Sequence, residues 1–127
     1  MKEGSRSLSA VRSRCLHELS IAESVVRIAS RQADGRRVTK VHMRVGHLRQ
    51  VVPSSLVFGF GLLAEGTPAE GAELEIVQVP AEGRCRGCGV ESMLGGFPLL
   101  CQGCGGFDVE ILRGEELMVD SLELEEA

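Results

Sequence analysis

The residues best suited to chemistry in this chain are four cysteines, Cys85, Cys88, Cys101 and Cys104. They follow the pattern C-x2-C-x12-C-x2-C, and a glycine follows each pair. Two such turns can place four thiolates at the corners of a tetrahedron, which is the geometry of a structural zinc site without an open coordination position. We therefore predict a Zn²⁺ ion that folds a small module and takes no part in catalysis.

Iron bound in the manner of rubredoxin is the main chemical alternative, because it uses similar paired cysteine turns. Modules of that kind pack aromatic side chains around the metal, and only Phe97 and Phe107 are candidates here. The shortage of aromatic residues favours zinc.

The elements around this module follow from periodicity. Apolar residues at helical spacing predict a helix over Ser20–Asp34, with Ser20 and Glu23 as a capping box. Alternation predicts a strand from Arg37 to Gly46, and Pro53 suits the first turn of a second helix, which Gly66 closes. Strands are also predicted over Glu73–Val79 and Glu116–Leu124, on either side of the cysteine module.

These elements predict an α/β fold, with two helices on a three-stranded, mainly antiparallel sheet and a zinc-ribbon-like module inserted before the last strand. We expect residues 16–80 and 115–127 to form the α/β domain and residues 81–114 to form the zinc-binding domain. Residues 1–15 are rich in Ser and Arg, and we interpret them as a disordered extension or a misassigned start.

Composition narrows the function. The formal net charge of −4 disfavours a sequence-independent nucleic-acid binder, and no apolar run is long enough to span a bilayer. Paired cysteine turns typify metal sites in a reducing compartment, so a cytoplasmic protein is expected. No catalytic triad, phosphate-binding loop or open metal site with a general base is evident, so we do not expect an enzyme.

Several segments resemble the HypA/HybF family, whose members insert nickel during hydrogenase maturation. The run from Leu16 to Ser24 is similar to the start of those proteins, which begin Met-His-Glu. The other similar segments are Arg44-Val45-Gly46, Val52-Pro53 with Phe58-Gly59-Phe60, Ala69–Leu74, the cysteine module and the closing strand.

The resemblance implies a Ni²⁺ site at the start of the chain, formed by the imidazole of His17 and nearby backbone nitrogens, including that of Glu18 and a terminal amine. Nickel(II) favours square-planar coordination by nitrogen. A peptide bond before Leu16 would remove the amine, so we hypothesise that Leu16 is the true first residue. The resemblance also implies two partners, a HypB-type GTPase and the large subunit of NiFe-hydrogenase.

Other candidate ligands are weaker. The cysteine module has no His between Gly89 and Leu100, where some members of the family have one. His42 is expected to be solvated on the polar face of a strand, and His47 to lie in a loop as a more plausible neighbour of nickel. Cys15 offers a soft ligand only if the extension is real. A zinc-ribbon module that binds protein or nucleic acid, without nickel, is the alternative function.

Overall fold

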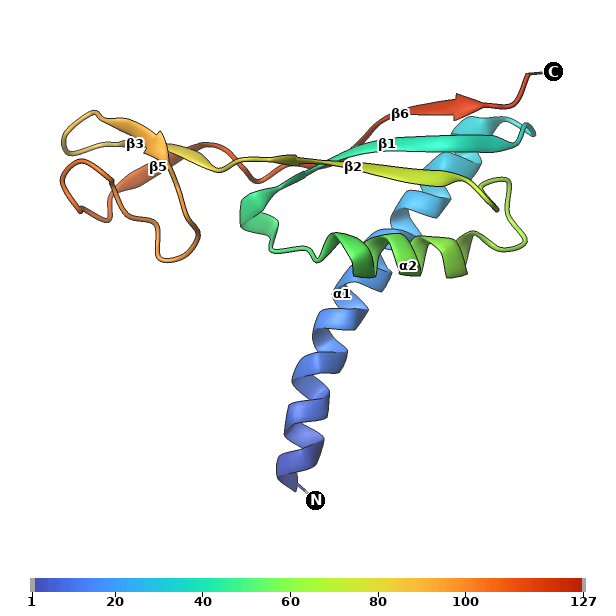
Figure 1. The fold of residues 1–127 in the computed structure, drawn as a ribbon, viewed down its shortest axis with the longest axis horizontal. Helices are drawn as coiled ribbons and strands as arrows, with labels where there is room; N and C mark the ends of the chain where they lie inside the picture. The colour runs from blue at the N-terminus through green and yellow to red at the C-terminus, as the bar shows by residue number, and fades with distance from the viewer. Residues whose placement is uncertain (1, 127) are drawn as a thin grey trace. The chain divides into compact units, whose positions relative to one another are not determined.

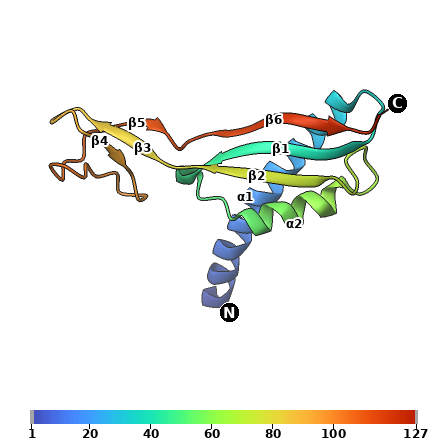
Figure 2. The same ribbon diagram turned by 45° about the horizontal axis from the view of Figure 1, so that its top comes forward.

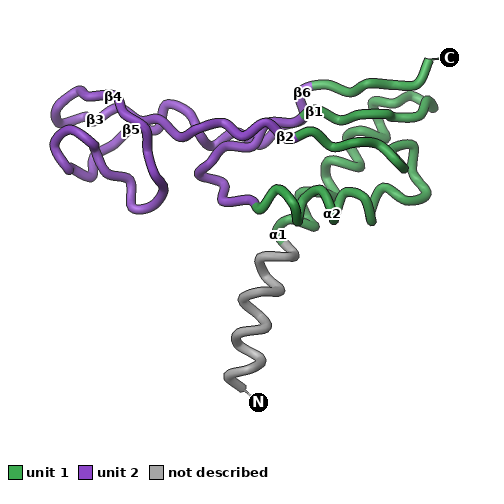
Figure 3. The backbone as a smooth tube through the Cα atoms, in the orientation of Figure 1, with its two compact units in different colours: residues 1–42, 52–75, 121–127 green, residues 43–51, 76–120 purple. Residues whose placement is uncertain are grey.

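The computed structural model describes the backbone of residues 2–126 and the side chains of residues 17–126 (Figure 1). The chain divides into two compact units, which Figure 3 colours separately. Unit 1 comprises residues 1–42, 52–75 and 121–127, and unit 2 comprises residues 43–51 and 76–120. Both units are therefore built from segments that are far apart in the sequence.

The first helix, α1 (Lys2–Ala33), is longer than expected. The predicted start at Ser20 is wrong, because Ser20 lies inside the helix and Glu23 binds Arg27 one turn later instead of capping. A capping box needs a non-helical residue at its first position, and this backbone is already helical there. The predicted apolar stripe is confirmed by the buried residues Ile21, Ala22, Val25, Val26, Ala29 and Ala33.

The helix ends where the sequence predicts. Asp34 and Gly35 both have positive φ angles, of 51° and 83°, which reverse the chain after Ala33. The next strand, β1 (Val38–Gly46), buries Val41, Met43 and Val45 and leaves alternate residues more exposed. This period of two is the alternation expected for a strand with one covered face.

The remaining predicted elements also form. Helix α2 (Pro53–Ala64) has its proline in the first turn, and strands β2 (Glu73–Val79) and β6 (Leu117–Leu124) follow. The sheet order is β2-β1-β6, so the central strand is β1 (Figure 2). The order of contacts along the strands makes the sheet mixed: Lys40–Glu73 and His42–Glu75 run in parallel, whereas Arg37–Glu125 and Gly46–Glu116 run antiparallel.

The two helices of unit 1 pack against each other, and a glycine sets how closely. A Cβ atom on Gly59 of α2 would lie 3.0 Å from the Leu19 side chain of α1. Close packing against α1 therefore explains the glycine at position 59. It does not explain Gly61, where an added Cβ would meet no described atom within 4 Å.

Unit 2 holds a second sheet, with the strand order β4-β3-β5. Its strands are β3 (Glu82–Cys85), β4 (Glu91–Met93) and β5 (Val109–Arg113), and β3 pairs antiparallel with both neighbours. Leu48 from the short helix η1 (His47–Arg49) is buried with Ala81 and Leu94 in a small core beside this sheet. None of the described helices has the length and apolar character needed to cross a membrane.

Candidate metal centre and its surroundings

The four cysteines come together at two matching turns. Cys85 ends β3, and the first turn closes through a hydrogen bond from the Gly89 amide to the Cys85 carbonyl, 2.8 Å long. The second turn repeats this contact from Gly105 to Cys101 at 2.9 Å. Gly89 and Gly105 both have positive φ angles, of 80° and 75°, which explains the glycine after each pair.

The four sulfur atoms lie within 4.8 Å of one another. The Sγ atoms of Cys85 and Cys104 are 3.7 Å apart, and those of Cys88 and Cys101 are 3.5 Å apart. Zinc–sulfur bonds of about 2.3 Å in a tetrahedron place the sulfurs about 3.8 Å apart. The cluster therefore fits one tetrahedral metal ion, and it is the only such group among the residues whose side chains are described.

Backbone amides prepare two of the thiols to bind a cation. The amides of Cys104 and Gly103 each donate to Cys101 Sγ at 3.3 Å, and the Cys88 amide donates to Cys85 Sγ at 3.4 Å. Donation from the Cys104 amide lowers the pKa of Cys101 to about 6, and donation from the Cys88 amide lowers the pKa of Cys85. Both thiols thus favour the thiolate form that metals bind.

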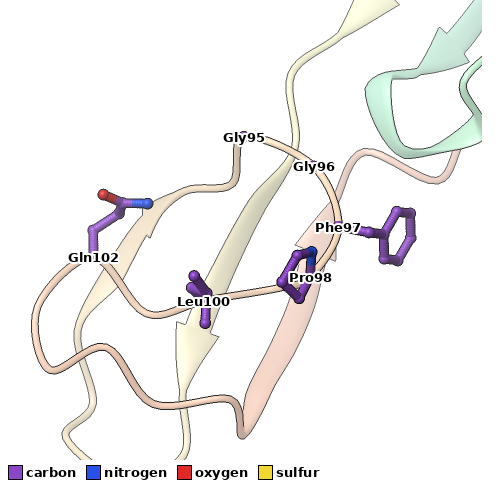
Figure 4. Close-up of a pocket in the computed structure, with 6 residues that line it drawn as sticks. All are labelled: Gly95, Gly96, Phe97, Pro98, Leu100 and Gln102. Carbon is purple, nitrogen blue, oxygen red and sulfur yellow. The ribbon is translucent and has the colours of Figure 1, made fainter.

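The aromatic side chains do not enclose this cluster. Phe97 is 60% exposed and Phe107 is 75% exposed. In Figure 4 the Phe97 ring points away from the loop that carries it, beside a cavity of about 260 Å³ lined by residues from Gly95 to Gln102. A hydrophobic shell that tunes a redox metal is therefore not built from these two residues.

The side chains of the two residues predicted for nickel lie in different environments. His17 is exposed, whereas the Glu18 side chain is 1% exposed and points into unit 1. Glu18 Oε2 accepts a 2.8 Å hydrogen bond from the Val52 amide, at the start of α2. Oε1 is buried and has no hydrogen-bond partner among the residues whose side chains are described. The side chains of Cys15 and Leu16, both considered as ligands, lie outside the described residues.

Two histidines make contacts that the sequence did not reveal. His42 on β1 is hydrogen-bonded at Nδ1 to Glu75 (2.8 Å) and at Nε2 to Glu123 (2.6 Å), on the two flanking strands. These bonds, first to Glu123 and then to Glu75, raise the pKa of His42. His47 Nε2 lies 3.2 Å from the Gly95 carbonyl oxygen, so its contact is with the loop of the cysteine module.

Comparison with known proteins identifies the family. Residues 16–124 match the family described as "Hydrogenase/urease nickel incorporation, metallochaperone, hypA". Hydrogenase maturation factor HypA from Geotalea uraniireducens (strain Rf4) is 46% identical over 110 residues, covering 87% of this chain and 100% of that protein. The chain belongs to the HypA family. HypA from Rippkaea orientalis (strain PCC 8801 / RF-1) is 37% identical over 111 residues, covering 87% of this chain and 97% of that protein.

Solved structures support the fold of this HypA family member. A solution structure of a HypA protein aligns with a TM-score of 0.63 at 23% identity, covering 87% of this chain and 97% of that one. The solution structure of the nickel metallochaperone HypA from Helicobacter pylori aligns with a TM-score of 0.60 at 23% identity, covering 84% and 96%. The predicted arrangement of two helices, a three-stranded sheet and a cysteine module is confirmed.

Proposed function

We propose that this protein binds Ni²⁺ near His17 in the cytoplasm and delivers it to the large subunit of NiFe-hydrogenase, together with a HypB-type GTPase. The observation that carries the proposal is the family match over residues 16–124, which includes both the His17 segment and the cysteine cluster. In this function the protein transfers a metal ion and catalyses no reaction.

The nickel ligands we propose are the His17 imidazole, the backbone nitrogens of His17 and Glu18, and the amine of a chain that begins at Leu16. Exposure of His17 leaves its imidazole accessible to an incoming ion. In the full chain, α1 includes both residues, and helical amides normally donate to carbonyls one turn earlier. In a chain that begins at Leu16 those carbonyls are absent, so both amides are free to coordinate the ion.

The metal that we propose for the cysteine cluster is a structural Zn²⁺ ion, held by Cys85, Cys88, Cys101 and Cys104. Four thiolates leave no open position for a substrate, so the ion would stabilise the zinc-binding domain that we place at residues 81–114. The four sulfur atoms, which lie within 4.8 Å of one another, support the binding of one metal ion.

Metal counting and a nickel titration test the proposal. The full chain and a chain that begins at residue 16 would be purified, their metals counted, and Ni²⁺ added. We expect one zinc per chain in both, and tighter binding of one nickel by the shorter chain. His17→Ala in the shorter chain should abolish this nickel site, whereas His47→Gln, at another exposed histidine, should not.

The same experiment addresses the alternatives. Zinc alone, with no nickel uptake by the chain that begins at residue 16, would favour a zinc-ribbon interaction module and overturn the nickel function. A red preparation that contains iron would instead support a redox protein.

A further inference from the structure

Helix α2 has an outer face without charge. None of its residues from Pro53 to Ala64 is ionisable, although four large apolar side chains on it are more than one-third exposed. Phe58 is 69% exposed and Leu62 is 51% exposed, and the other two are Val57 and Leu63. Because Phe58 and Leu62 are four residues apart, they lie on the same side of the helix. A surface helix normally carries polar residues there.

Phe58 and Leu62 border a groove of about 310 Å³ within unit 1. Leu19 of α1 and Gly59 of α2 form its apolar part, and Ser54 and Ser55 lie at the first turn of α2. Gly61, one position from Leu62, faces open space, so nothing in the described part of unit 1 requires a glycine there. A glycine at this position allows the backbone of another helix to approach closely.

Glu18 also lines the groove and is its one ionisable lining residue. Its side chain is 1% exposed, and Oε1 has no hydrogen-bond partner within the described part of the chain. Buried polar atoms are normally paired, and a carboxylate oxygen pairs most strongly with a cationic donor. The groove thus combines an apolar body with an acceptor that a basic side chain would satisfy.

We infer that this groove docks an amphipathic helix of a partner protein, with apolar residues four positions apart and a Lys or Arg beside Glu18. The apolar pair would pack between Phe58, Leu62 and Leu19, in the manner of a helix in a groove. The basic side chain would donate to Glu18 Oε1. The choice of partner rests on the proposed function, because a metallochaperone must bind the protein that receives its metal ion or the protein that assists the transfer.

Purified HypB-type GTPase and hydrogenase large subunit from the host provide the probes, and their binding to the full chain can be measured by calorimetry. Phe58→Ala and Leu62→Ala should each weaken binding of the probe protein whose helix occupies the groove by at least about tenfold, as truncation of a central apolar anchor does. Val77→Ala, at a residue of β2 that is 51% exposed, is the matched control and should change affinity by less than about twofold.

A photo-crosslinking residue at position 62 then identifies the occupant. A crosslink to a partner helix with an apolar pair and a nearby Lys or Arg supports the inference. Crosslinks to an acidic segment or to a second copy of this chain overturn it. The inference is also overturned if the wild-type chain binds neither probe protein, or if Phe58→Ala and Leu62→Ala leave the affinity for the partner unchanged. Nickel uptake measured on the same variants keeps the two proposals separate, because a failure to bind nickel leaves the groove test standing.

Discussion

A Cβ atom on Gly46 would lie 2.0 Å from the carbonyl oxygen of Gly114, so the backbones of these two residues touch. The contact is held by neighbouring hydrogen bonds, from the Gly46 amide to Glu116 O (2.7 Å) and from the Leu48 amide to Gly114 O (2.9 Å). The end of β1 therefore meets the segment that leads into β6, and only glycine fits at the junction.

Gly46→Ala should lower the free energy of unfolding by about 1–3 kcal/mol or more, because the new methyl group must displace a backbone carbonyl. Gly61→Ala is the matched control, since its methyl group enters open space and alanine favours the helix by about 1 kcal/mol. Urea unfolding measures both. Equal effects of the two substitutions would show that the close contact does not limit stability.

Glu18→Ala should destabilise unit 1 by about 1–3 kcal/mol, because the Val52 amide loses the carboxylate that accepts its hydrogen bond. Glu18→Gln keeps an acceptor oxygen and should cost less. The comparison is made by thermal and urea unfolding. If Glu18→Gln lowers the free energy of unfolding as much as Glu18→Ala does, the negative charge at the start of α2 matters more than the hydrogen bond.

Cys101→Ser should remove the bound metal and loosen the module built from β3, β4 and β5, because this thiol has the most favourable amide contacts of the four. Metal content and amide hydrogen exchange test this. We expect the amides of β3 to lose protection while those of α2 keep theirs. Retention of a full metal ion by Cys101→Ser would contradict the four-sulfur site.

The His42 network should make stability depend on pH. The pKa of His42 is raised in the folded protein by Glu123 and Glu75, so its contribution is fully present below the unfolded pKa of about 6.5 and is lost as pH rises through the folded value. The pKa of Glu75 is lowered, by His42 and then Lys40, so its contribution is lost on acidification instead.

His42→Gln should accordingly reduce the melting temperature more at pH 6 than at pH 9, relative to wild type at the same pH. His47→Gln is the control, because His47 contacts only a carbonyl oxygen. A melting-temperature difference that is the same at both pH values would mean that His42 acts without its charge.

Nickel binding by the chain that begins at residue 16 should strengthen by more than about tenfold for each pH unit, because coordination releases more than one proton from the amine, amides and imidazole. A competition titration between pH 6 and pH 8 measures this. Acetylation of the terminal amine of that chain should abolish most of the effect, because an acetylated amine cannot coordinate the ion. An unchanged affinity after acetylation would remove the amine from the ligand set.

Local patterns predicted much of this fold. Pro53, Gly66 and Pro80 mark ends of α2 and β2 because proline and glycine restrict the backbone in ways that depend little on distant contacts. The cysteine spacing likewise predicted the cluster, since each turn forms from five consecutive residues. Ser20 and Glu23 misled because serine and glutamate also occupy exposed positions inside a helix.

Long-range contacts were not predictable in the same way. The bonds of His42 depend on the order β2-β1-β6, which brings Glu75 and Glu123 to one residue from opposite sides. The inward direction of Glu18 had a signal that was missed: residues 18, 22, 25, 29 and 33 fall on one helical stripe, and the last four are alanine or valine. A carboxylate on an apolar stripe indicates a buried acceptor.

Leu48 comes from the segment between β1 and α2, yet its side chain belongs to the small core beside β3. Grafting residues 81–114 into another protein would transfer all four cysteines but would leave out Leu48, one of the buried residues of that core. The portable unit for engineering is therefore discontinuous, and a designer who grafts the cysteine turns must also supply a leucine from elsewhere in the new host.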